Sequence, residues 1–88
     1  MKKKLYCIVV SDVYDYCENY HKPELATTAR ERDEIVARLK AQALIDTPDW
    51  KLENHKGDTG FSLYLDGEYS CNHYTVTAYE YDMDIMFK

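Results

Sequence analysis

The sequence is poor in residues that break regular structure and contains no long apolar run. It has three glycines and two prolines among 88 residues, with 45% hydrophobic and 31% charged residues. This composition excludes a disordered tail and indicates a packed domain. The apolar run at residues 5–10 is shorter than a signal-peptide core of about 7 to 15 residues, or the roughly 20 that span a bilayer. We therefore expect one domain, residues 1–88, that does not contact a membrane.

The cysteines are too few, and odd in number, for a disulfide scaffold. The three are Cys7, Cys17 and Cys71. Small secreted scaffolds use an even set of cysteines that pair within the chain. We expect reduced thiols and a cytoplasmic location.

Motifs for catalysis and cofactor binding are also missing. The sequence has no G-x-S-x-G elbow, no G-x-G-x-x-G loop and no Walker A motif. Cys17 with His21 and Cys71 with His73 form a Cys₂His₂ set, but neither pair has zinc-finger spacing. We expect no catalytic residue, no metal and no cofactor, and we keep a small zinc-binding module as a further alternative.

The helix is the best-marked element of the chain. Thr28 and Glu31 have the spacing of a capping box directly before a periodic segment. The apolar residues of that segment follow one helical stripe: Ala29, Ile35, Val36, Leu39, Ala43 and Leu44. We expect the helix to end near Asp46, before Pro48.

Strand patterns flank the helix on both sides. Residues 3–16 are rich in β-forming residues and apolar on both faces, which predicts an interior strand, whereas residues 18–26 lack a period and predict a loop. Residues 50–65 alternate as a hairpin, and a last strand runs from about Cys71 to beyond Tyr81. The expected fold class is α+β in β-α-β-β-β order, with one amphipathic helix packed on a mainly antiparallel four-stranded sheet.

In the last strand, the apolar residues change from even-numbered to odd-numbered positions near Ala78, and we call this the parity change. Even positions are apolar before it, and odd positions are apolar after it. A slip of one residue swaps the faces of a strand, so we expect either a β-bulge near Ala78 or the end of the strand there. In a regular strand, Glu80, Asp82 and Asp84 would form a row of carboxylates on one face.

Tyrosine and acid are the two features in excess. Nine tyrosines occur in 88 residues and the net charge is −5, even with lysines at positions 2–4. Acidity disfavours direct nucleic-acid binding and favours basic protein surfaces, where tyrosine is a common contact residue. We expect Tyr6 and Tyr74 in the core. The expected partner-binding residues are Tyr14, Asp15, Tyr16, Glu18, Tyr79, Glu80, Tyr81 and Asp82, with Tyr20 also exposed.

In size, acidity and tyrosine content the chain resembles, as a class, the inhibitors that phages and mobile elements direct against bacterial defence nucleases, anti-CRISPR proteins included. The resemblance implies an acidic surface that imitates nucleic acid in a basic cleft. We accordingly expect a non-enzymatic protein-binding module whose partner is a basic protein surface, such as a nucleic-acid-binding enzyme. The alternative is a structural domain that self-associates as a homodimer.

Overall fold

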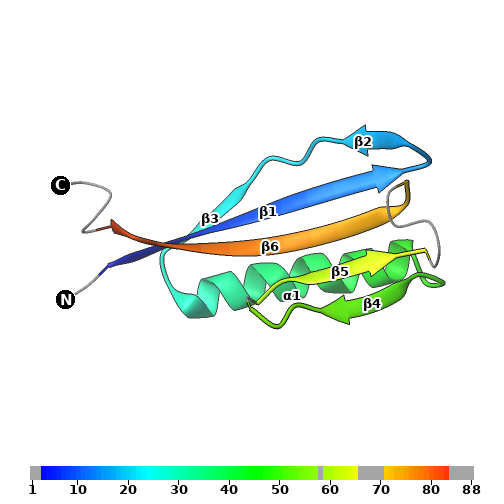
Figure 1. Ribbon diagram of the computed structural model, residues 1–88. Helices are drawn as coiled ribbons and strands as arrows, with labels where there is room; N and C mark the ends of the chain where they lie inside the picture. The colour runs from blue at the N-terminus through cyan, green and yellow to red at the C-terminus, as the bar shows by residue number, and fades with distance from the viewer. Residues whose placement is uncertain (1–2, 58, 66–70, 84–88) are drawn as a thin grey trace.

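The computed structural model describes residues 3–57, 59–65 and 71–83, and it shows one helix lying on one face of an antiparallel sheet (Figure 1). The elements in chain order are β1 (Lys4–Tyr14), β2 (Cys17–Asn19), β3 (Glu24–Ala26), α1 (Ala29–Asp46), β4 (Lys51–Asn54), β5 (Phe61–Tyr64) and β6 (His73–Asp82). The strand order is β2-β1-β6-β5-β4, and β3 pairs with β1 on the same side as β2.

The α+β class, the interior position of the first strand and the β4–β5 hairpin are confirmed. Within the described residues the sheet has six strands rather than four, because residues 18–26, expected as a loop, contribute to β2 and supply β3. All three residues of β2 are exposed. A short edge strand with no buried side chain has no apolar alternation by which sequence could reveal it.

The first strand ends in a tight hairpin rather than continuing to residue 16. Tyr14 pairs with Cys17, which leaves Asp15 and Tyr16 as a two-residue loop. Both have positive φ, 49° and 65° respectively. Positive φ at both central residues is the type I′ geometry that matches the twist of the flanking strands.

The edge formed by β2 and β3 contains one extra residue. Asp12 pairs with Asn19 and Ile8 pairs with Glu24, so three residues of β1 face four residues at 20–23. An extra residue in one strand exchanges the faces of the residues beyond it. We call residues 20–23 the edge bulge; its extra residue allows both His21 and Glu24, three positions apart, to face the helix.

The bulge expected near Ala78 is absent, and so is a strand end there. β6 pairs with β1 without a break from His73 to Asp82. The parity change has another cause: Val76 and Ala78 are buried on the helix face, whereas Tyr79 and Tyr81 lie on the open face, the face without α1. The carboxylate row is partly retained, because Glu80 and Asp82 share a face, whereas Asp84 lies outside the described residues.

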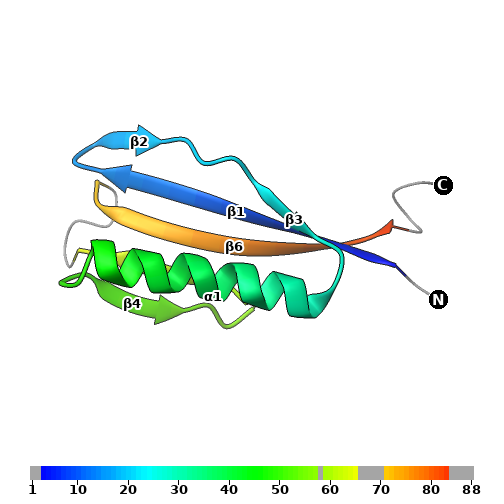
Figure 2. The same ribbon diagram turned by 180° about the vertical axis from the view of Figure 1, so that it is seen from behind.

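The core lies between α1 and the middle of the sheet (Figure 2). Its buried residues are Tyr6, Ile8, Ala26, Val36, Ala43, Phe61, Leu63, Val76 and Ala78, with Val10, Ile35, Leu39, Trp50 and Tyr74 partly buried against them. Tyr6 is thus in the core as expected, and Tyr74 packs at its margin. Ala29 and Leu44, expected in the helical stripe, are exposed, because only a narrow strip of one helix contacts a sheet.

In the part of the chain that the structure describes, no helix is long and apolar enough to cross a membrane.

The helix begins as its sequence predicts. Thr28 is the N-cap, and its Oγ1 accepts a hydrogen bond from the backbone N–H of Glu31 at 3.1 Å. The Glu31 carboxylate in turn accepts from the hydroxyls of Thr27 and Thr28. α1 ends at Asp46, and the N–H of Thr47 donates to Ala43 O at 2.9 Å.

Replacing Thr28 by alanine should lower the free energy of unfolding by about 1 kcal/mol, because a helical N–H loses its acceptor. Urea denaturation measures the change. Thr27→Ala is the matched control, since the Thr27 hydroxyl reaches only the Glu31 carboxylate and caps no backbone N–H. Equal losses in the two variants would show that the cap contributes nothing specific.

Candidate functional site

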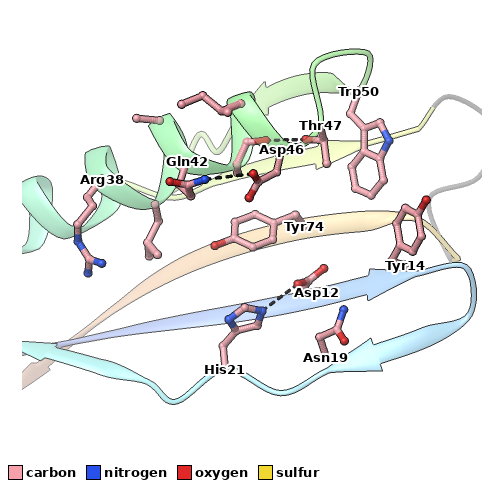
Figure 3. Close-up of a pocket in the computed structure, with 14 residues that line it drawn as sticks. Asp12, Tyr14, Asn19, His21, Arg38, Gln42, Asp46, Thr47, Trp50 and Tyr74 are labelled. Carbon is pink, nitrogen blue, oxygen red and sulfur yellow. Dashed lines mark hydrogen bonds and ion pairs between the residues drawn. The ribbon is translucent and has the colours of Figure 1, made fainter.

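A groove of about 800 Å³ lies between the C-terminal half of α1 and the part of the sheet formed by β1 and β2. In Figure 2 the C-terminal half of α1 lies beside β6, and the ends of β1 and β2 that meet in their hairpin lie on the other side of β6. The lining residues are Asp12, Tyr14, Asn19, His21, Arg38, Leu39, Ala41, Gln42, Ala43, Ile45, Asp46, Thr47, Trp50 and Tyr74 (Figure 3). The volume is within the range of small-molecule and side-chain binding sites.

The sheet side of the groove carries a histidine–carboxylate pair. His21 Nε2 lies 2.8 Å from Asp12 Oδ2. Asp12 comes from β1, and His21 is one of the four residues, 20–23, that form the edge bulge between β2 and β3; His21 faces the helix side of the sheet. The His21 ring also meets the Tyr74 ring edge-on, with centroids 6.0 Å apart. Both contacts fix the orientation of the imidazole.

Tyr74 of β6 forms the floor of the groove, between the wall formed by α1 and the wall formed by β1 and β2. Its pKa is raised above 10.0, mainly because burial penalises the phenolate, and further because the carboxylate of Asp12 lies nearby. Asp46 and Glu24 raise it too, and Arg38 opposes them. Tyr74 is therefore a neutral phenol at physiological pH, in surroundings where negative charge dominates.

Two aromatic rings close one end of the groove. Tyr14 is the last residue of β1, and Trp50 follows the turn that ends α1, where its backbone N–H donates to Thr47 O at 3.2 Å. The rings are nearly parallel, 13° between planes, with centroids 6.4 Å apart. Figure 3 shows them at the end opposite Arg38. Trp50 is the single tryptophan of the chain.

The charged groups of the helix wall are held differently. Arg38 Nη2 donates to both oxygens of Glu24 on β3, at 2.5 and 2.6 Å, which joins the helix to the sheet edge. Asp46 accepts a hydrogen bond of 3.1 Å from Gln42 Nε2, a neutral donor. The cation of this wall is thus paired with a carboxylate, whereas the Asp46 carboxylate accepts from a neutral amide.

The expected partner-binding residues fall into two groups at opposite ends of the sheet. Tyr14, Asp15, Tyr16 and Glu18 lie at the β1–β2 hairpin. Tyr79, Glu80, Tyr81 and Asp82 lie at the far end of β6. Tyr79 pairs with Cys7, seven residues from Tyr14 along β1, or roughly 24 Å at about 3.4 Å per residue. The structure therefore does not join the two groups in one patch.

Within each group the side chains also divide between faces. Tyr14 lines the groove on the helix face, whereas Glu18 pairs with Val13 and faces the other way. In β6, Tyr79 and Tyr81 occupy the open face, and Glu80 is on the helix face, where its Oε2 lies 3.3 Å from Lys4 Nζ. Tyr14, Tyr16, Tyr20, Tyr79 and Tyr81 are all exposed, as expected.

The Cys₂His₂ set does not assemble. His21 contacts Asp12 and His73 contacts Ser11 Oγ at 3.2 Å, and these consecutive residues of β1 point to opposite faces. Residues 3–57, 59–65 and 71–83 hold no group of three or more histidine, cysteine or acidic side chains that could bind a metal ion. The three cysteines are not joined by disulfides.

Sequence reasoning missed the groove itself. Its distinctive residues are Asp12, His21, Asp46, Trp50 and Tyr74, which come from separate elements and share no spacing. Tyr14 is the one groove residue among the expected partner-binding residues, and it is expected there as part of the exposed Tyr14–Tyr20 segment rather than of a groove. A groove assembled by a helix, an edge bulge and a turn leaves no local motif.

No protein-family model, no curated protein and no solved structure matches this chain. The aromatic faces, carboxylates and oriented imidazole of the groove, with the exposed hairpin beside it, form a surface suited to binding.

The raised pKa of Tyr74 makes stability depend on pH. The folded protein holds the phenolic proton more tightly than the unfolded chain, so the stabilisation is complete below pH about 10 and is lost as pH rises through the folded-state pKa. Urea denaturation between neutral pH and pH about 11 should therefore show a smaller decline for Tyr74→Phe than for the original protein. Tyr20→Phe, at an exposed ring, is the control. Identical declines in the original protein and Tyr74→Phe would contradict the assignment.

Proposed function

We propose that this chain is a non-enzymatic protein-binding module that engages a basic protein surface through the end of the molecule formed by the β1–β2 hairpin and the mouth of the groove. The observation that carries the proposal is Tyr16. This residue has φ 65° and is 82% exposed at the tip of a two-residue turn.

The fold itself does not favour tyrosine at this position. Glycine and asparagine are the residues that adopt positive φ in a type I′ turn, and a side chain with a bulky Cβ substituent pays about 1 kcal/mol or more there. The backbone N–H of Tyr16 donates to Cys71 O at 3.3 Å, which helps to hold the turn, but the exposed ring adds little core packing to offset that cost. Unfavourable backbone geometry in a folded protein is concentrated at functional positions, which supports a partner contact for Tyr16.

The two ends of the molecule also differ in charge, and the difference supports a basic partner at the hairpin end. The hairpin end carries Asp12, Asp15, Glu18, Asp46 and Asp49, with Lys51 beside them. At the other end, acids lie against cations: Glu80 on Lys4, Asp33 on Arg32 and Glu34 on Arg30. The hairpin end is therefore the more negative, and negative potential there attracts a basic partner.

A basic cleft that normally holds nucleic acid is the partner class that we propose. Such a cleft is lined by lysine and arginine, and it also provides surfaces that stack with aromatic rings. Exposed tyrosines beside carboxylates supply both complements. Occupation of the cleft by this module would inhibit the enzyme without chemistry of its own.

Affinity purification from cells of the source, with quantitative mass spectrometry, should recover a basic partner whose retention falls with added salt. Asp15→Lys with Glu18→Lys should reduce capture more than tenfold. Glu80→Lys with Asp82→Lys is the matched reversal at the other end of the molecule, and it should reduce capture less. Capture insensitive to both salt and hairpin charge would contradict the proposal.

Tyr16→Gly separates partner binding from folding. Because glycine adopts positive φ readily, the free energy of unfolding of this variant should equal that of the original protein or exceed it by up to about 1 kcal/mol. It should nevertheless capture the partner less well. Unchanged capture by a fully folded Tyr16→Gly protein would remove Tyr16 from the contact.

A second candidate function, homodimerisation, is favoured by the open face of the sheet. Cys7 lies between Leu25 and Tyr79 in the strand pairing, and Leu5 pairs with Tyr81. Leu25 is 61% exposed on this face. The other half of the open face is polar, with hydrogen-bonded pairs Ser11–His73 and His55–Ser62. A bounded apolar patch on a sheet face suits an isologous contact with a second copy.

Gel filtration with light scattering should show a concentration-dependent dimer, if this second candidate is correct. Leu25→Glu should shift the protein to monomer, because it places a charge in the patch. Leu44→Glu, at an exposed leucine of α1, should not. A monomer at every concentration, up to near-millimolar, excludes self-association.

A further inference from the structure

The groove beside the hairpin offers an aromatic wall to a ligand. Tyr14 and Trp50 present nearly parallel rings at its end, and Trp50 is only partly buried. The faces of aromatic rings carry negative potential and attract cations, tryptophan most strongly. A planar guanidinium also stacks on such faces, whereas a compact ammonium does not.

The same groove lacks cationic charge of its own that is available to a ligand. Among its lining residues, Arg38 is bound by both oxygens of Glu24, and His21 is bound by Asp12. Asp46 is hydrogen-bonded only to the neutral side chain of Gln42 in the contacts of this wall. Asp12 and Asp46 flank Tyr74 in Figure 3, and the charges of both raise its pKa, whereas Arg38, the cation paired with Glu24, lowers it.

Shape and position complete the case. A groove of about 800 Å³ accepts a long side chain together with the residues on either side of it. Tyr14 belongs both to the groove and to the hairpin that carries Asp15 and Tyr16, so a partner on the hairpin has the groove directly beside it.

We infer that the groove receives an arginine side chain of the basic protein partner, with the guanidinium stacked against Tyr14 or Trp50 and paired with Asp46. This inference rests on the proposed function, which it deepens by naming the group that enters the groove. A carboxylate and an aromatic face together are the arrangement that guanidinium uses best.

Two short peptides test the inference directly: acetyl-Gly-Arg-Gly-amide, and the same peptide with citrulline, which has the shape of arginine without its charge. Titration is followed by Trp50 fluorescence and by the indole N–H signal in NMR spectra, which belongs to one residue because the chain has one tryptophan. The arginine peptide should shift both signals saturably, and the citrulline peptide should bind at least fivefold more weakly. Equal responses to the two peptides would overturn the inference.

Asp46→Asn is the decisive variant. It keeps an oxygen to accept from Gln42 and removes a negative charge from a helix C-terminus, so the fold should be retained. Affinity for the arginine peptide should fall on the order of fivefold, which corresponds to about 1 kcal/mol. Asp49→Asn, an exposed acid outside the groove lining, is the matched control and should change affinity less than twofold. Equal losses of affinity in the two variants would show that only the net charge of the protein matters, and would overturn the proposed pairing of the guanidinium with Asp46.

The arginine site and the proposed function can fail independently, and the two sets of experiments distinguish these cases. If a basic partner is captured through Asp15 and Glu18 but Asp46→Asn captures it fully, the protein-binding role stands and the arginine site falls. If the arginine peptide binds in the groove but no partner is captured, the groove assignment stands and the proposed function falls.

Discussion

The unbroken pairing of β1 with β6 is the constraint on which the rest of the structure depends. Their register runs from Lys4↔Asp82 to Val13↔His73 without a bulge, and it fixes the face of every side chain in the centre of the sheet. Ile8, Val76 and Ala78 are thereby assigned to the helix face. The other strands add to the two free sides of this pair, and α1 covers only part of the resulting face.

Incomplete coverage creates the surfaces available for binding. One helix on this sheet leaves β1 and β2 beside the groove, and the edge bulge directs His21 into it. Had the edge strand been regular, His21 and Glu24 would have faced opposite sides, so that either the Asp12 contact or the Arg38 contact would have been lost. One added residue thus connects the sheet edge to the helix and shapes the groove.

The hairpin and the groove form one continuous end of the molecule, and both carry aromatic and acidic side chains. Tyr14 belongs to both, carboxylates surround them, and Tyr16 occupies a turn position better suited to glycine. The second pair of exposed tyrosines, Tyr79 and Tyr81, faces the open side of the sheet about 24 Å away along the strands. The two tyrosine-rich segments therefore lie on different surfaces, one at the hairpin end and one on the open face of the sheet.

The sequence by itself determined the elements whose signals are local. Thr28 and Glu31 mark the start of α1, the run in β1 predicts an interior strand, and exposure of the hairpin tyrosines follows from their polar neighbours. Only the tertiary structure decided the edge strands and the groove, because a strand with no buried face has no pattern, and Asp12, His21, Asp46, Trp50 and Tyr74 meet only when separate elements pack. It also decided the parity change near Ala78, because a switch of apolar positions can mean a bulge or a change from a covered to an uncovered face, and only the position of the helix distinguishes the two.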